Sequence, residues 1–269
     1  MIPDVLPAAR WWHMTLLFGI GTLLLGLLLG QSFPQNSFAA SPGYGAPVLA
    51  FEFAGGQDDL IAIFGPDSDP RQIGRLAAMR TGNERDYLYM LLYAGFLGCG
   101  LVALGHETGL KAVSFTAALP VLAALCDAWE NWLLFDIQAA FTVGDYSPAM
   151  ASLPYPVAAK FILLALTNVA IGLALARLGS RWWTLAGTLV IVACVPALMA
   201  IAVPSLYGWT LLAATGGGWI ALLGTAAIAN WRAVLKKQPL VSTEAAGKRP
   251  VPAPTADTSP RPTFGRRRS

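Results

Sequence analysis

Charged residues are scarce in this sequence. Only 12% of its 269 residues are charged and 55% are apolar, whereas soluble domains carry about 25% charged residues. The apolar residues gather in runs of about 20, the length that spans a bilayer as a helix. The short alternating segments typical of a transmembrane β-barrel are absent. We therefore expect an all-α integral membrane protein, a bundle of about six transmembrane helices with a short outer-side amphipathic segment.

The sequence also has few residues of the types that bind metals or attack substrates. Its three cysteines, Cys99, Cys126 and Cys194, form no C-x-x-C pair, and we expect them to act as small packing residues. Its two histidines, His13 and His106, belong to no H-E-x-x-H motif. Nucleotide-binding glycine loops and G-x-S-x-G are absent too. We expect no metal and no cofactor, lean against an enzyme, and leave the catalytic residues unknown.

Basic residues in the short loops predict the orientation. Six apolar runs are predicted to span: Trp11–Gly30, Tyr87–Gly105, Ala112–Phe135, Pro156–Ala176, Trp182–Val203 and Trp209–Asn230. Arg10, Lys111, Arg177 and Arg181 then all fall on one side of the membrane, together with both termini. Since basic loops stay inside, we predict cytoplasmic termini in a bacterial inner (cytoplasmic) membrane.

These spans divide the chain into four parts. Residues 1–30 form an N-terminal transmembrane helix, a possible signal anchor. The alternative is a signal peptide that is removed, because Ser37-Phe-Ala39 is a small-residue cleavage candidate. Residues 31–86 form an extracytoplasmic linker and amphipathic segment. Within it, a short helix capped by Asp69 and ending at Gly82 is predicted to lie on the outer leaflet. Residues 87–230 form a five-helix bundle.

The last part, residues 231–269, is predicted to be a disordered basic cytoplasmic tail. It is rich in Pro, Ala and Thr and ends Arg266-Arg-Arg-Ser269, so it has too little apolar surface to fold alone. Anionic lipid headgroups are the partners that its charge suggests. Nucleic acid is not expected, because no folded basic surface is predicted. The other expected partners are the lipid bilayer and a membrane protein, either a second copy or another chain.

A polar cluster interrupts the third span. Asp127, Glu130 and Asn131 are spaced i, i+3, i+4, so they share one helix face. A carboxylate at mid-bilayer costs about 2.5–3.5 kcal/mol, and therefore needs a partner. Lys160 lies at a similar depth on the next, antiparallel span and is the natural counter-ion; Asn168 continues its face. These five residues form the candidate functional polar cluster.

Two more carboxylates, Glu52 and Asp86, have apolar neighbours near the outer side. Either could join the cluster, although ordinary interfacial carboxylates are the favoured interpretation. Asp127 and Glu130 together outnumber Lys160, so one carboxylate could hold a proton, or a second cation could be needed. The candidates for that cation are Arg80, Arg85 and a bound ion.

Small residues in the sixth span predict close helix packing. Ala213, Gly217, Ala221 and Gly224 share one face there, next to a run of three glycines, Gly216-Gly-Gly218.

Three short segments carry a resemblance: Leu49-Ala-Phe-Glu-Phe53, Asp86-Tyr-Leu-Tyr and Asp127-Ala-Trp-Glu-Asn131. Together they resemble a group of small bacterial multi-pass membrane proteins of uncharacterised activity, which carry an intramembrane D-x-x-E-N motif. The similarity covers roughly Val48–Ala176. It implies a multi-pass helical fold, and it implies no activity.

Three functions follow as hypotheses, in this order. The first is a structural, assembly or interaction component of a membrane complex, whose polar network sets helix packing. The second is a small ion- or proton-coupled transporter that uses Asp127, Glu130 and Lys160. The third is a lipid-modifying enzyme at the outer leaflet, with a carboxylate as general base.

Overall fold

The computed structural model describes residues 7–141 and 146–234, and within them it is a helical bundle without strands. Six helices are long and apolar enough to cross a membrane. The helices are α1 (Pro7–Ser32), α2 (Pro47–Glu52), α3 (Gln57–Phe64), α4 (Gln72–Thr108), α5 (Lys111–Phe115), α6 (Ala118–Phe141), α7 (Ser147–Ser152), α8 (Pro154–Ala176), α9 (Arg181–Ala202) and α10 (Pro204–Val234), with a 3₁₀ turn at Pro42–Tyr44. The predicted all-α transmembrane bundle is confirmed.

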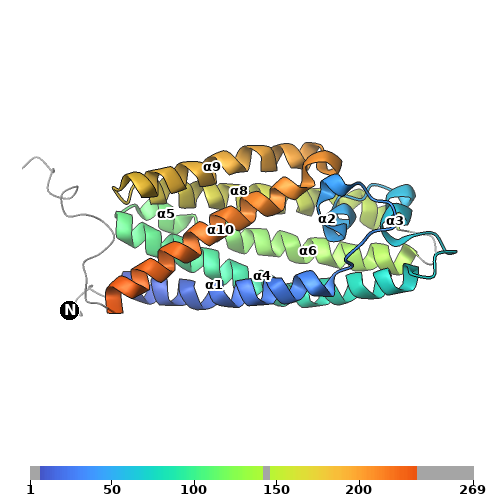
Figure 1. Cartoon of the computed structure of the whole chain (residues 1–269), viewed down its shortest axis with the longest axis horizontal. Coiled ribbons are helices and arrows are strands. Elements are labelled where there is room, and N and C mark those ends of the chain that lie inside the picture. The colour runs from blue at the N-terminus through green and yellow to red at the C-terminus, as the bar shows by residue number, and fades with distance from the viewer. Residues whose placement is uncertain (1–6, 142–145, 235–269) are drawn as a thin grey trace, which may run out of the picture.

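The long helices run side by side along one axis, except α10, which crosses the bundle obliquely (Figure 1). It leaves α9 near the short helices α2 and α3 and reaches α1 at the opposite end. There α1 begins and α10 ends. We call the first region the α2 end and the second the terminal end. Because of this crossing, α1 and α10 diverge towards the α2 end.

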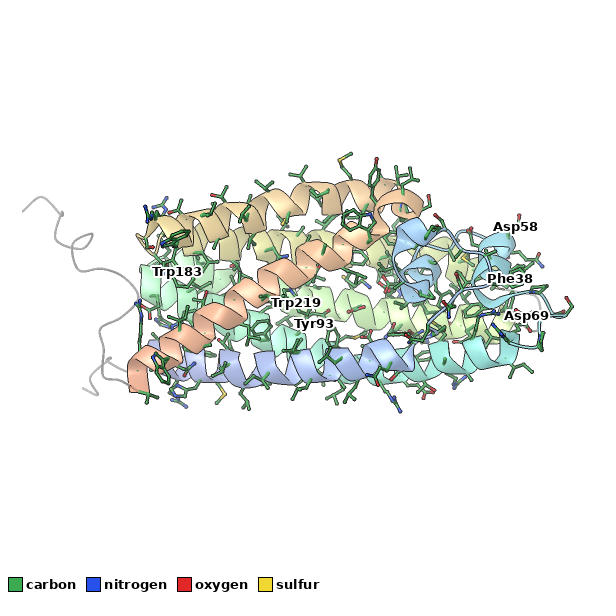
Figure 2. The ribbon with its side chains drawn as sticks, viewed as in Figure 1. Phe38, Asp58, Asp69, Tyr93, Trp183 and Trp219 are labelled. Atoms are coloured by element: carbon green, nitrogen blue, oxygen red, sulfur yellow. The ribbon has the colours of Figure 1, made fainter. Side chains whose placement is uncertain are left out.

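The side chains sort as expected for a protein in lipid. Many outward-facing residues are large and apolar; Leu17, Leu91 and Ile220, for example, are each more than 60% exposed (Figure 2). Apolar side chains pointing outward on every spanning helix fit a bilayer rather than water. The chain is thus a multi-pass membrane protein.

Two apolar clusters fill the interior. One lies towards the terminal end and includes Trp12, Leu101 and Leu222; the other lies towards the α2 end and includes Phe64 and Leu134. Along α6, Asp127 and Glu130 lie between Ala123 of the first cluster and Leu133 of the second. On α8, Lys160 lies among residues of the second cluster, one turn from Leu164 of the first. The polar residues are therefore close to the place where the two apolar clusters meet.

The predicted short helix on the outer leaflet is wrong. The helix does not end at Gly82, because α4 continues without a break from Gln72 to Thr108. Gly82 is buried in its middle, and a Cβ there would collide with the ring of Phe33. The glycine thus serves a close ring contact rather than a helix end. The proposed boundary between residues 86 and 87 consequently falls inside one helix.

Several helix ends also differ from the predicted spans. Helix α6 continues past the predicted end at Phe135 to Phe141, and α10 begins at Pro204 rather than Trp209. Each extension is more polar or aromatic than the apolar run that identified the span, so the hydropathy pattern could not mark it. Residues 235–269 of the predicted tail lie outside the described part of the chain.

An ion pair fixes the turn between α3 and α4. The Arg75 guanidinium lies 2.6 Å from the Asp69 carboxylate and donates to the carbonyl of Phe64 at 2.8 Å. The hydrogen bond from Arg75, aided by the backbone N–H of Arg71, lowers the pKa of Asp69 below its ordinary value. A carboxylate with a lowered pKa stabilises the folded state above its unfolded pKa, and that stability is lost as the pH falls through the lowered value.

We predict from this pair that the turn opens in acid. Below about pH 4, the ordinary range of an aspartate, amide hydrogen exchange at residues 65–75 should accelerate relative to the middle of α4. Asp69→Asn should exchange faster at neutral pH and lose this acid response. If the exchange rate of the wild-type turn relative to that of the middle of α4 stays constant between pH 6 and pH 3, the ion pair does not hold the turn.

Candidate functional site

Lys160 on α8 is the centre of the polar cluster. Its Nζ lies 3.1 Å from a carboxylate oxygen of Glu52, 3.1 Å from one of Asp127, and 2.7 and 2.8 Å from the two oxygens of Glu130. The structure thus contains the expected pairs with α6 and adds a third from α2. The lysine is 4% exposed and Glu130 is 1% exposed, so both are out of reach of bulk water.

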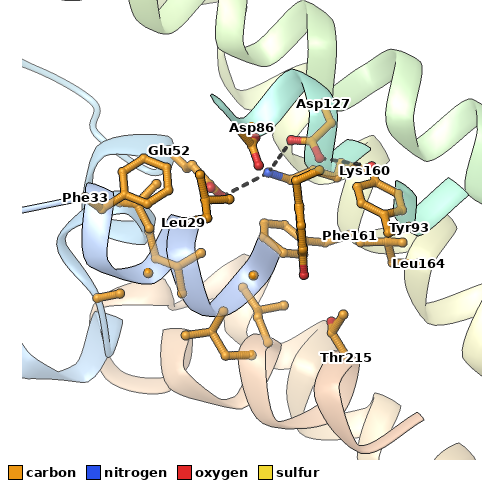
Figure 3. A pocket seen from close by; sticks show the side chains of 18 of the residues that line it. Leu29, Phe33, Glu52, Asp86, Tyr93, Asp127, Lys160, Phe161, Leu164 and Thr215 are labelled. Atoms are coloured by element: carbon orange, nitrogen blue, oxygen red, sulfur yellow. Dashed lines mark hydrogen bonds and ion pairs between the residues drawn. The ribbon is translucent and has the colours of Figure 1, made fainter. Parts of the chain in front are cut away.

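Two hydrogen-bond donors extend the cluster to α4. The Tyr93 hydroxyl donates to Asp127 at 2.9 Å, and the Asn131 amide donates to Asp86 at 3.0 Å (Figure 3 shows the first of these). Asn131 also reaches the backbone carbonyl of Asn83 at 3.3 Å. The network therefore joins α2, α4, α6 and α8.

Negative charge exceeds positive charge in this cluster. Four carboxylates, Glu52, Asp86, Asp127 and Glu130, meet a single lysine. Neither arginine considered as a second cation pairs with the cluster: Arg80 pairs with Glu84 at 3.0 Å, and Arg85 donates to Ser32 at 2.6 Å. Both contacts lie on the exposed side of α4.

The interpretation of Glu52 and Asp86 as ordinary interfacial carboxylates is wrong. Glu52 is 9% exposed and bonded to Lys160, and Asp86 faces Asn131. Glu52 reaches the lysine because α2, a one-turn helix, folds back against α6 and α10. Burial raises the pKa of Glu52, and the charge of Lys160 opposes that rise. Glu52 thus takes up a proton more readily than an exposed glutamate.

Asn168 lies apart from the cluster. Its amide donates to the carbonyl of Ala214 on α10, and its side chain packs against Gly218. Gln138, further along α6, donates to the backbone of Leu76 instead. Asn168, which was expected to belong to the functional cluster, thus makes a separate helix contact, and so does Gln138.

A cavity of about 360 Å³ borders the cluster. Its polar wall contains Glu52, Asp86, Asp127 and Lys160 (Figure 3). Glu130 pairs with Lys160 but does not line the cavity. The rest of the lining comes from α1, the segment that follows it, α2, α8 and α10. Its apolar side chains are Leu29, Phe33, Val48, Leu49, Phe161, Leu164, Leu211, Leu212 and Trp219. The cavity therefore combines a charged side with a largely apolar lining.

The edge of the cavity reaches the lipid-facing surface. Leu212 on α10 lines it and is 51% exposed, and Gly30 on α1 lines it and is also exposed. These two residues lie on the helices that diverge towards the α2 end (Figure 1). The cavity thus opens between α1 and α10, on the lipid-facing surface of the bundle.

Sequence reasoning missed Tyr93 and Asn83. Tyr93 is 1% exposed and donates to Asp127. Asn83 is 1% exposed, and neither polar atom of its side chain has a hydrogen-bond partner among the residues that the structure describes. A helical spacing of three and seven from Asp86 could have identified both as members of its face. Their position in a long helix became visible only once α4 was known to be continuous.

Three comparisons with known proteins add no identification: no protein family, no curated protein and no solved structure matches the chain. Within residues 7–141 and 146–234, no group of three or more His, Cys, Asp and Glu side chains is arranged to hold a metal ion. The fold and the site define a multi-pass, all-α membrane protein with a charged cavity. The resemblance to D-x-x-E-N membrane proteins stays a prediction.

Proposed function

We propose that this protein is a small proton-coupled carrier of an amphiphilic molecule. The observation that carries the proposal is the cavity beside the cluster, which is lined by three carboxylates and by many apolar side chains. Such a cavity fits a molecule that has one polar end and one hydrocarbon end. Lateral access between α1 and α10 suits a ligand that arrives through the lipid.

The surplus of carboxylates supports the proton coupling. Lys160 neutralises one carboxylate, and its shortest contacts are with Glu130. Glu52, Asp86 and Asp127 then share no further cation among the described residues. Burial raises the pKa of Glu52, so this carboxylate takes up a proton more readily than an exposed glutamate does. A ligand that brings positive charge to the cluster favours ionisation of Glu52, and the proton leaves.

The structural hypothesis, which the sequence placed first, is the second candidate. It is favoured by the three elements that Lys160 ties together, α2, α6 and α8. Polar contacts within membranes stabilise a fold by about 0.6 kcal/mol on average, and neutral amides would supply them at a lower insertion cost. A purely structural role, in which the polar contacts only hold the helices together, needs neither the extra carboxylates nor the cavity. We therefore rank it below the carrier.

Orientation forms part of the proposal. Basic residues at the terminal end, Arg10, Lys111 and Arg177 among them, favour a cytoplasmic position for that end. The cavity then lies towards the extracytoplasmic side of a bacterial inner membrane. Its inner side is closed by the apolar cluster that contains Trp12, Leu101 and Leu222, so a carrier would have to rearrange these helices to release the ligand inward.

Retention of a native ligand tests the proposal. The protein would be extracted with its surrounding lipid and examined by native mass spectrometry. Gly216 lines the cavity, and a Cβ there meets no atom within 4 Å, so Gly216→Leu should fill the space without a collision. We expect a small molecule bound to the wild type and reduced about tenfold in Gly216→Leu.

Gly217→Leu is the matched control. Gly217 is the next residue of α10, is exposed, and equally has open space around its Cβ, but it does not line the cavity. It should retain the ligand at the wild-type level. Equal amounts of bound small molecule in all three proteins, or none in any of them, would argue against the carrier. The structural hypothesis would then be the better explanation.

A further inference from the structure

The polar wall of the cavity has features that select one kind of head group. Glu52, Asp86 and Asp127 line it, and Lys160 is paired with Glu130, which does not line the cavity. An anionic head group would face three carboxylates for one shared lysine. A head group that carries a positive charge would instead provide the missing counter-ion for this wall.

An aromatic group stands next to these carboxylates. Tyr89, Tyr93 and Trp219 all line the cavity. The centroids of the Tyr93 and Trp219 rings are 5.4 Å apart, and Tyr89 lies 5.8 Å from Tyr93 and 6.1 Å from Trp219. The faces of aromatic rings attract cations, and rings beside carboxylates are an environment in which proteins bind ammonium groups.

Asn83 provides an independent observation that points to a ligand. It lines the cavity, is 1% exposed, and neither its side-chain Nδ2 nor its side-chain Oδ1 has a hydrogen-bond partner within the described residues. Buried amides are rarely left without partners. A ligand with a hydrogen-bond donor would satisfy the Asn83 carbonyl, and the primary ammonium group carries three such donors.

We propose that the cavity binds a single-chain amphiphile with a primary ammonium head group. The ammonium lies against Asp86 and Asp127, beside the three aromatic rings and within reach of Asn83. The hydrocarbon chain runs along Leu29 and Leu212 and leaves between α1 and α10. Binding replaces carboxylate protons by the ammonium charge, which is the exchange that a proton-coupled carrier needs. This inference rests on the proposed function and names its substrate class.

Three probes of equal chain length test the head group: dodecylamine, dodecanol and dodecanoate. Each would be titrated into the full chain in nanodiscs of zwitterionic lipid, and probe molecules bound per protein would be counted by native mass spectrometry. We expect one dodecylamine per chain at a concentration at least about tenfold lower than dodecanol requires. Dodecanoate should not bind above the background that Gly216→Leu shows.

Two variants connect binding to the charged wall. Asp86→Asn keeps the shape of the side chain and removes one charge, so the dodecylamine concentration for half-saturation should rise about tenfold. Glu84→Gln changes a carboxylate on the exposed side of the same helix, where Glu84 is paired with Arg80, and should bind as the wild type does. If Asp86→Asn proves unstable, Trp219→Leu should weaken dodecylamine binding and leave dodecanol binding unchanged.

The outcomes separate the two proposals. If dodecanol or dodecanoate binds as well as dodecylamine and Gly216→Leu removes it, the amphiphile site stands and the ammonium selection is overturned. Equal binding of dodecylamine to the wild type and Asp86→Asn would overturn it too. If no probe binds in a manner sensitive to Gly216→Leu, and no native ligand is retained, both proposals fail.

Discussion

Lys160→Met is expected to destabilise the protein by about 3–5 kcal/mol, the usual cost of removing one partner from a buried ion pair. The methionine would fill a similar volume, so packing should change little. What changes is charge, because Glu52, Asp127 and Glu130 would all lose their only ion-pair partner among the described residues. Reversible unfolding in mixed micelles by increasing fractions of denaturing detergent would measure the loss.

Lys111→Met is the control for this substitution. Lys111 is exposed at the start of α5, and its removal should cost less than about 0.5 kcal/mol, as for most surface changes. Adding Glu130→Gln to Lys160→Met should recover part of the lost stability, because one unpaired carboxylate disappears with it. A loss below about 1 kcal/mol in Lys160→Met would mean that the carboxylates are already neutral without the lysine.

Gly187→Leu should destabilise the packing of α9 against α8. A Cβ at Gly187 would collide with the backbone of Gly172 and approach the backbone N of Ala176 at 3.0 Å. Because these neighbours are backbone atoms, they cannot rotate away, and the two helices must separate. Overpacking of this kind costs about 1–3 kcal/mol, which the same unfolding experiment can resolve.

Gly217→Leu again supplies the comparison, since the same leucine there points into open space. It should change stability by no more than about 0.5 kcal/mol, and the higher helix propensity of leucine favours a gain. Equal destabilisation by the two substitutions would show that leucine disturbs these helices through the backbone or the lipid, and not through the α8–α9 contact.

The spans and the central ion pairs could be predicted because each depends on local pattern. Apolar length marks a spanning helix, and a three- and four-residue spacing puts Asp127 and Glu130 on one face. Antiparallel neighbours then place Lys160 at their depth. The two ion pairs on α6 follow from these arguments alone, without knowledge of how the other helices are arranged.

Glu52 could be named only as a carboxylate that could join the cluster, and the cavity could not be predicted at all, because both depend on how distant segments fold back. Nothing in the sequence around Glu52 indicates that α2 turns towards α6 and Lys160. The small-residue face of α10 shows the same difficulty. Gly217 and Gly224 have open space beside them, whereas Gly218, outside the predicted face, packs against Asn168. Small residues identify a capacity for close packing, and only the arrangement of helices decides which of them use it.

The charged and apolar parts of the cavity lining differ in when they become available during synthesis. The charged side comes from α2, α4, α6 and α8, whereas part of the apolar lining comes from α10, which is synthesised after the other described helices, and from α1, which is synthesised before them. The carboxylates and the lysine are therefore all present in the new chain before the cavity can be completed.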